Sequence, residues 1–185
     1  METFLVSTGL VTIAEIGDKT QLLALMLAAR FKKPLPIILG ILAATVLNHA
    51  LAASVGALVA GWLGGEVMRW VLAASFLAMA AWALIPDKAD DDLRLLGKAG
   101  AFMATLVSFF LIEIGDKTQI ATVALAARFE NIPVVTAGTT TGMMLADVPA
   151  VFMGNLAGDR LPLKLIRMAT AAVFAALGIG ALLMG

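Results

Sequence analysis

The stretch Glu-Ile-Gly-Asp-Lys-Thr-Gln, residues 15–21, returns unchanged at residues 113–119, 98 positions later. Both copies lie in the middle of long apolar runs. Carboxylates and lysines at membrane depth are costly, and they mark functional sites by default. Coincidence is a poor explanation for the return of a whole heptapeptide. The stretch is therefore either a duplicated binding site or a duplicated packing device, and buried charge is a poor device for packing.

The composition indicates a polytopic membrane protein. Of 185 residues, 61% are hydrophobic and 14% are charged, and the mean hydropathy is +0.98. A soluble domain carries about 25% charged residues. The apolar residues gather into six runs, each long enough to cross a hydrocarbon core of roughly 30 Å. We predict an all-α integral membrane protein with six transmembrane helices, near residues 4–29, 35–62, 66–85, 99–127, 132–157 and 162–184.

Several classes of function are excluded by what the chain lacks. It has no cysteine, which rules out disulfides, thiolate metal sites and cysteine nucleophiles. It has one histidine, His49, which excludes most mechanisms of histidine-based catalysis. The net charge is zero, so no nucleic-acid partner is expected. Residues 1–4 lack the basic region of a signal peptide, and we expect the N-terminus to begin the first span.

The repeat extends beyond the heptapeptide at the same offset and without a gap. Each half contains three predicted spans, an odd number, so the second half must enter the membrane from the opposite side. Inverted-topology repeats are typical of secondary transporters, whose site lies near the midplane between the repeats. We expect residues 1–86 and 99–185 to form two inverted three-helix repeats, joined by a charged cytoplasmic linker at 87–98. The matches include residues 27–31 with 125–129, Gly40 with Gly138, Gly56 with Gly154, Arg69 with Arg167, and Phe76 with Phe174.

The distribution of basic residues predicts the orientation. Cytoplasmic loops carry an excess of lysine and arginine. We therefore expect the richer side to be cytoplasmic, with both termini on the outer side of a bacterial inner membrane. The richer side has nine basic residues, Arg30, Lys32, Lys33, Lys88, Arg94, Lys98, Arg160, Lys164 and Arg167, whereas the other side has Arg69 and Arg128.

The motif places two acids in each half at the predicted midplane. On a continuous helix, Glu15 and Asp18 would project from nearly the same face, as would Glu113 and Asp116. The intervening glycine removes a side chain where a helix bend, a close neighbour or a carbonyl ligand would be useful. If a pseudo-two-fold axis passes between the first and fourth spans, all four carboxylates converge.

Four convergent carboxylates predict a cation site. They cannot all be ionised in a low dielectric without compensating positive charge. That charge can come from the motif lysines, from protons or from a metal ion. Carboxylate oxygens suit calcium, manganese or magnesium better than copper or zinc. The same acids would bind protons when the metal leaves, which couples metal in one direction to protons in the other. No prosthetic group is expected.

Polar residues around the motifs are further candidates. His49 corresponds to Asp147 at the repeat offset, so each half has a titratable residue at the same depth. His49 could carry a proton, ligate the ion or only pack. The motif threonines and glutamines could support the carboxylates or bond between helices, and the lysines are better counter-ions than metal ligands. The candidates for supporting the ion or carrying protons are Lys19, Thr20, Gln21, Asn48, His49, Lys117, Thr118, Gln119 and Asp147.

Two copies of Glu-x-Gly-Asp-(Lys/Arg)-(Ser/Thr), in the first and fourth of six spans, resemble the signature of the calcium/manganese cation–proton antiporter family. That family includes bacterial manganese exporters and Golgi and chloroplast manganese transporters. The resemblance covers essentially the whole chain. It implies export of Mn²⁺, with Ca²⁺ as a second candidate substrate, in exchange for protons. It also implies an ion site at Glu15, Asp18, Glu113 and Asp116, whereas His49 and Asp147 lie outside the signature.

Three other functions fit parts of the pattern. An intramembrane aspartyl protease also uses two aspartates on neighbouring spans, but its usual tyrosine is absent here and glutamates stand where its first glycine would be. A six-span exporter of amino acids or similar solutes shares the layout, although four acids fit a divalent cation better. A passive channel with an acidic ring is the third. The sequence leaves open the choice between Mn²⁺ and Ca²⁺ and the formation of a homo-oligomer.

Overall fold

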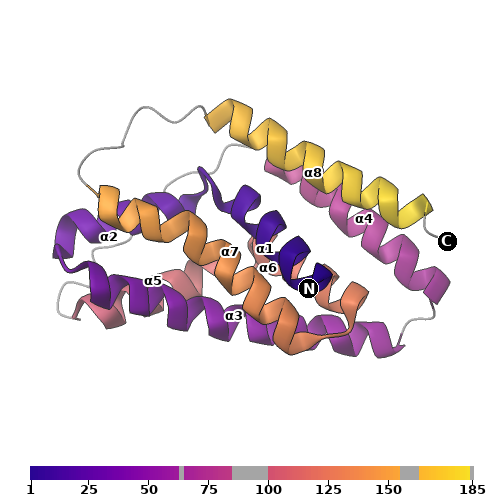
Figure 1. Ribbon diagram of the computed structural model, residues 1–185, viewed down its shortest axis with the longest axis horizontal. Coiled ribbons are helices and arrows are strands. Elements are labelled where there is room, and N and C mark those ends of the chain that lie inside the picture. Colours follow the sequence, from indigo (N-terminus) through magenta and orange to yellow (C-terminus); the bar gives the residue numbers. More distant parts are fainter. Residues whose placement is uncertain (63–64, 85–99, 155–162, 184–185) are drawn as a thin grey trace.

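The computed structural model describes residues 1–62, 65–84, 100–154 and 163–183, and the regular secondary structure in these ranges is entirely helical. The all-α prediction is therefore confirmed for the part of the chain that the structure describes (Figure 1). The helices are α1 (Glu2–Glu15), α2 (Lys19–Phe31), α3 (Pro34–Trp62), α4 (Gly65–Ala83), α5 (Ala101–Glu113), α6 (Lys117–Phe129), α7 (Ile132–Met153) and α8 (Leu163–Leu183).

Two of the predicted spans are not continuous helices. The run predicted at 4–29 is divided into α1 and α2, and the run predicted at 99–127 into α5 and α6. Within the described ranges, α3 is the one helix both long and apolar enough to cross a membrane. The six-span arrangement thus stays a prediction. The linker predicted at 87–98 lies outside the described residues.

The long helix α3 turns its polar side chains inward. Asn48 and His49 are buried in the protein, whereas Leu47 and Leu51 are 51% and 58% exposed. A helix in a soluble protein has the opposite arrangement, with its polar face outward. Apolar side chains facing out and polar side chains facing in are suited to a lipid environment.

The two halves pack against each other reciprocally. Helix α1 lies along α7, and α5, the counterpart of α1, lies along α3, the counterpart of α7. The contacts recur residue by residue. A Cβ atom added at Gly40 would lie 2.8 Å from Cβ of Thr105, and one added at Gly138 would lie 2.8 Å from Cβ of Ser7. Both glycines therefore allow a close helix approach that a larger residue would prevent.

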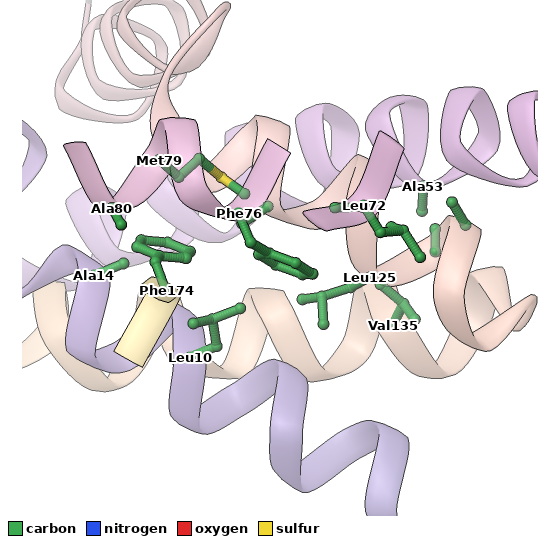
Figure 2. Packing of buried hydrophobic residues seen from close by; sticks show 14 of the residues in the cluster. Leu10, Ala14, Ala53, Leu72, Phe76, Met79, Ala80, Leu125, Val135 and Phe174 are labelled. Carbon is green, nitrogen blue, oxygen red and sulfur yellow. The ribbon is translucent and has the colours of Figure 1, made fainter. Parts of the chain in front are cut away.

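Helices α4 and α8, which are counterparts at the repeat offset, pack lengthwise on one another (Figure 1). Phe76 and Phe174 also correspond, and their rings stack with centroids 6.4 Å apart. Figure 2 shows this pair in a buried apolar cluster together with Leu10 and Leu125. Equivalent residues that meet each other are what a two-fold relation between the halves requires.

Candidate cation site

Each copy of the motif forms a type II turn. Ile16 has φ −62° and ψ 117°, Gly17 has φ 79°, and the Asp18 N–H donates to the Glu15 carbonyl at 3.0 Å. In the second copy, Ile114 and Gly115 repeat these angles to within a degree. The third residue of a type II turn needs a positive φ, which glycine adopts without steric cost. The glycine therefore fixes the position of the helix break.

The break changes the geometry predicted for the acids. Glu15 ends α1, and Asp18 is the N-cap of α2. The prediction that they share one face of a continuous helix is wrong, because the helix is interrupted between them. Asp-x-x-Gln is a helix-start pattern related to the capping box, a signal present in the sequence. Here the glutamine at the third helical position accepts from the glycine before the cap: Gly17 N–H donates to Gln21 Oε1 at 2.8 Å.

Three of the four predicted acids converge where the two turns meet. Glu15, Glu113 and Asp116 can each offer one oxygen such that all three oxygens lie within 4.8 Å of one another. All three residues are buried. Oxygens around one Ca²⁺ lie about 2.3–2.6 Å from it, so two oxygens on opposite sides of the ion are separated by about twice that distance. This separation is close to the 4.8 Å within which the three oxygens lie. The arrangement can accommodate a hard divalent cation.

Each of the two glutamates has one oxygen bonded to a threonine and one without a hydrogen-bond partner among the described residues. Thr20 Oγ1 donates to Glu15 Oε2 at 2.5 Å, and Thr118 Oγ1 donates to Glu113 Oε2 at 3.2 Å. The other oxygen, Oε1, is buried in both glutamates and has no hydrogen-bond partner among the described residues. A buried carboxylate oxygen without a partner is costly unless a cation or a proton compensates it. The motif threonines thus orient the glutamates, and the bare oxygens identify the place for a cation.

Each motif lysine forms an ion pair with the motif aspartate of the opposite half. Lys19 pairs with Asp116, Nζ to Oδ1, at 2.9 Å, and Lys117 pairs with Asp18. The Lys117 pair is buried, and Asp18 lies outside the group of three converging acids. Each aspartate therefore has a counter-ion supplied by the opposite half.

The remaining candidates have different surroundings. Gln21 Nε2 donates to the Ala146 carbonyl of α7 at 3.0 Å, and Asn48 Nδ2 donates to the Phe110 carbonyl at 3.0 Å. Gln119 accepts from the Gly115 N–H at 2.7 Å. The side-chain amides of these three residues therefore form hydrogen bonds with backbone groups.

His49 and Asp147 lie outside the converging group. Both are fully buried, and neither ring nitrogen and neither carboxylate oxygen has a hydrogen-bond partner among the described residues. The structure does not bring them into the group formed by Glu15, Glu113 and Asp116.

Comparison with known proteins gives a family match over nearly the whole chain. The model of the divalent cation/proton antiporter GDT1 family matches residues 3–91 and 101–185. A Vibrio cholerae protein named "Putative manganese exporter" is 51% identical over 175 residues, which cover 94% of this chain and 87% of that protein. GDT1-like protein 5 of Arabidopsis thaliana is 23% identical, covering 99% of this chain and 96% of that protein. No solved structure matches.

Proposed function

Because the chain belongs to the GDT1 family of divalent cation/proton antiporters, we propose that it exports Mn²⁺ from the cytoplasm in exchange for protons. Membership of this family makes it a membrane transporter and not an enzyme, which removes the intramembrane protease from the alternatives. The name of the Vibrio cholerae relative supports Mn²⁺ as the cargo. Ca²⁺ is the second cation to test, because the same hard oxygen ligands suit both ions.

The proposed ion site consists of Glu15, Glu113 and the motif aspartates. Two observations support it: one oxygen each of Glu15, Glu113 and Asp116 converge, and each glutamate has a buried oxygen without a hydrogen-bond partner among the described residues. A divalent cation supplies the missing positive charge when the transporter is loaded. Protons supply it when the cation leaves, so the same oxygens exchange one cargo for the other.

The proposed transport cycle uses the two halves as inverted repeats. Metal enters from the cytoplasm and displaces protons, one half rocks against the other, and external protons then displace the metal. The reciprocal contacts of Gly40 and Gly138 support this relation between the halves. The excess of basic residues on one side supports an orientation with both termini outside, in the bacterial inner membrane.

Transport by purified protein in liposomes with an imposed pH gradient tests the proposal. We expect Mn²⁺ to accumulate on the acidic side of the membrane, accompanied by proton movement in the opposite direction. Mn²⁺ flux without proton movement would indicate a passive channel. Absence of Mn²⁺ and Ca²⁺ flux, with transport of an amino acid, would support the solute exporter instead. The variant Glu66→Gln is the matched control, because this carboxylate is exposed on α4.

A further inference from the structure

The two motifs have identical sequences but unequal surroundings. The side chain of Lys19 is 26% exposed, whereas that of Lys117 is 7% exposed. Asp116 belongs to the group of converging acids, and its counterpart Asp18 does not. Such unequal arrangements of identical motifs are what one of two related states of an inverted-repeat molecule would have.

A third difference lies at the motif glutamines. Gln21 Nε2 bonds to the Ala146 carbonyl of α7. The counterpart bond would join Gln119 to the carbonyl of Asn48 on α3. Among the described residues, Gln119 makes its bond to Gly115 but not this one. Through its glutamine, the first motif therefore bonds to a helix of the opposite half, whereas the second motif lacks this bond among the described residues.

The unequal burial decides which aspartate a cation can take. Both side chains of the Lys117–Asp18 pair are buried, and separating two buried charges is strongly unfavourable. Lys19 is 26% exposed, so its ammonium can stay solvated when it leaves the buried Asp116, which lowers the cost of separating this pair. An incoming cation can thus replace Lys19 at Asp116 while Lys117 keeps Asp18.

We propose that the cation is held by Glu15, Glu113 and one motif aspartate at a time, and that the lysine of the opposite half determines which aspartate is available. In this state the ion pair with Lys117 keeps Asp18 from binding the cation. Exchanging the roles of the halves gives the other state, in which Lys19 withholds Asp116 and Asp18 completes the site. Lys19 and Lys117 are then positioning residues, and the cation changes aspartates as access changes sides. This inference rests on the proposed function.

The test fixes each state separately in the full-length protein, which has no native cysteine. A short bifunctional thiol reagent would join Gln21→Cys to Ala146→Cys, the positions in contact here. The matched pair at the repeat offset, Asn48→Cys with Gln119→Cys, would fix the other state. Binding of Mn²⁺ alone to each cross-linked protein in detergent is then measured by electron paramagnetic resonance, with Asp18→Asn or Asp116→Asn added.

In the first cross-linked protein, Asp116→Asn should weaken Mn²⁺ binding by more than about tenfold, the range seen when groups that support a metal site are lost. Asp18→Asn should change it by less than about threefold, because Asp18 is not a ligand in that state. The second cross-linked protein should show the reverse order. Equal effects of the two variants in both proteins would overturn the inference. Absence of Mn²⁺ binding before either aspartate is changed would instead contradict the proposed function.

A second measurement needs no cross-link. Lys117→Met removes the competitor for Asp18, so it should tighten Mn²⁺ binding while slowing turnover, which lowers KM and kcat together. Adding Asp18→Asn should return the affinity toward that of the unaltered chain, since the freed carboxylate is lost again. Monodisperse elution on size-exclusion chromatography establishes that each variant is folded. Mn²⁺ binding to Lys117→Met no tighter than to the unaltered chain would show that the lysine does not compete with the cation.

Discussion

At the scale of single residues, the glutamates and the aspartates of the motif are held differently. Each glutamate accepts from a threonine five residues later, and its other oxygen has no hydrogen-bond partner in the part of the chain that the structure describes. Each aspartate meets a lysine from the opposite half. The glutamates are therefore the fixed part of the candidate site, and the aspartates are the part whose availability depends on a competing cation.

Neutral amides at the glutamates test this division. Glu15→Gln and Glu113→Gln keep the shape of the side chain but remove a carboxylate that faces the other acids. We expect each to lower Mn²⁺ transport by more than about tenfold, because the loss of one ligand affects metal affinity at least as much as loss of a supporting group. Initial rates in liposomes at equal protein amounts provide the measurement. Rates within twofold of the unaltered chain would exclude these glutamates from the site.

Removing a threonine hydroxyl tests whether the glutamates must be oriented. Thr118→Val keeps the volume of the side chain and deletes the bond to Glu113, together with a longer bond to Asp116. Groups that orient a ligand typically contribute about 10–100-fold to metal affinity. We expect a rise in KM of that order, measured from transport at graded Mn²⁺ concentrations. Thr141→Val is the control, because its hydroxyl donates to the Ala137 carbonyl of its own helix. An equal effect of both variants would contradict an orienting role.

At the scale of elements, the glycine of each motif determines where the helix breaks. Gly115 has φ 78°, and a Cβ added there would meet nothing within 4 Å. Gly115→Ala should therefore destabilise the fold through backbone strain, by about 1–2 kcal/mol. Gly9→Ala, inside α1 and equally free of contacts, should instead stabilise it by up to about 1 kcal/mol. Thermal unfolding in detergent should show shifts of opposite sign, and a matching sign would argue against the turn geometry.

The sequence singles out the residues of the candidate site, but it did not predict how the structure arranges them. The repeat offset identified the acids and lysines, because the recurrence of unusual residues is visible without a structure. Hydrophobic periodicity could not show that Gly17 interrupts a helix, since apolar residues lie on both sides of the short polar motif. The Asp18-to-Gln21 cap was the available signal. The partition of the aspartates could not be predicted, because the two motifs are identical in sequence and differ only in their tertiary surroundings.

At the scale of the whole molecule, the proposed inverted topology places equivalent positions on opposite sides of the membrane. Lys33 follows α2, and its counterpart Asn131 precedes α7; both are exposed. Single cysteines at these positions can be labelled without interference, because the chain contains no other cysteine. In intact cells, a membrane-impermeant thiol reagent should label Asn131→Cys and leave Lys33→Cys unlabelled until the membrane is opened. Labelling of both from outside would contradict the inverted arrangement.

The reciprocal packing has a consequence for ancestry. In each half, the motif aspartate pairs with a lysine of the other half, and a glycine packs against a helix of the other half. On the proposed topology, an ancestral half-chain would have reached this arrangement only by pairing with a second copy inserted in the opposite direction. Joining the copies into one chain then let equivalent positions diverge. His49 corresponds to Asp147 at the repeat offset, a difference that two copies of one gene product could not have had.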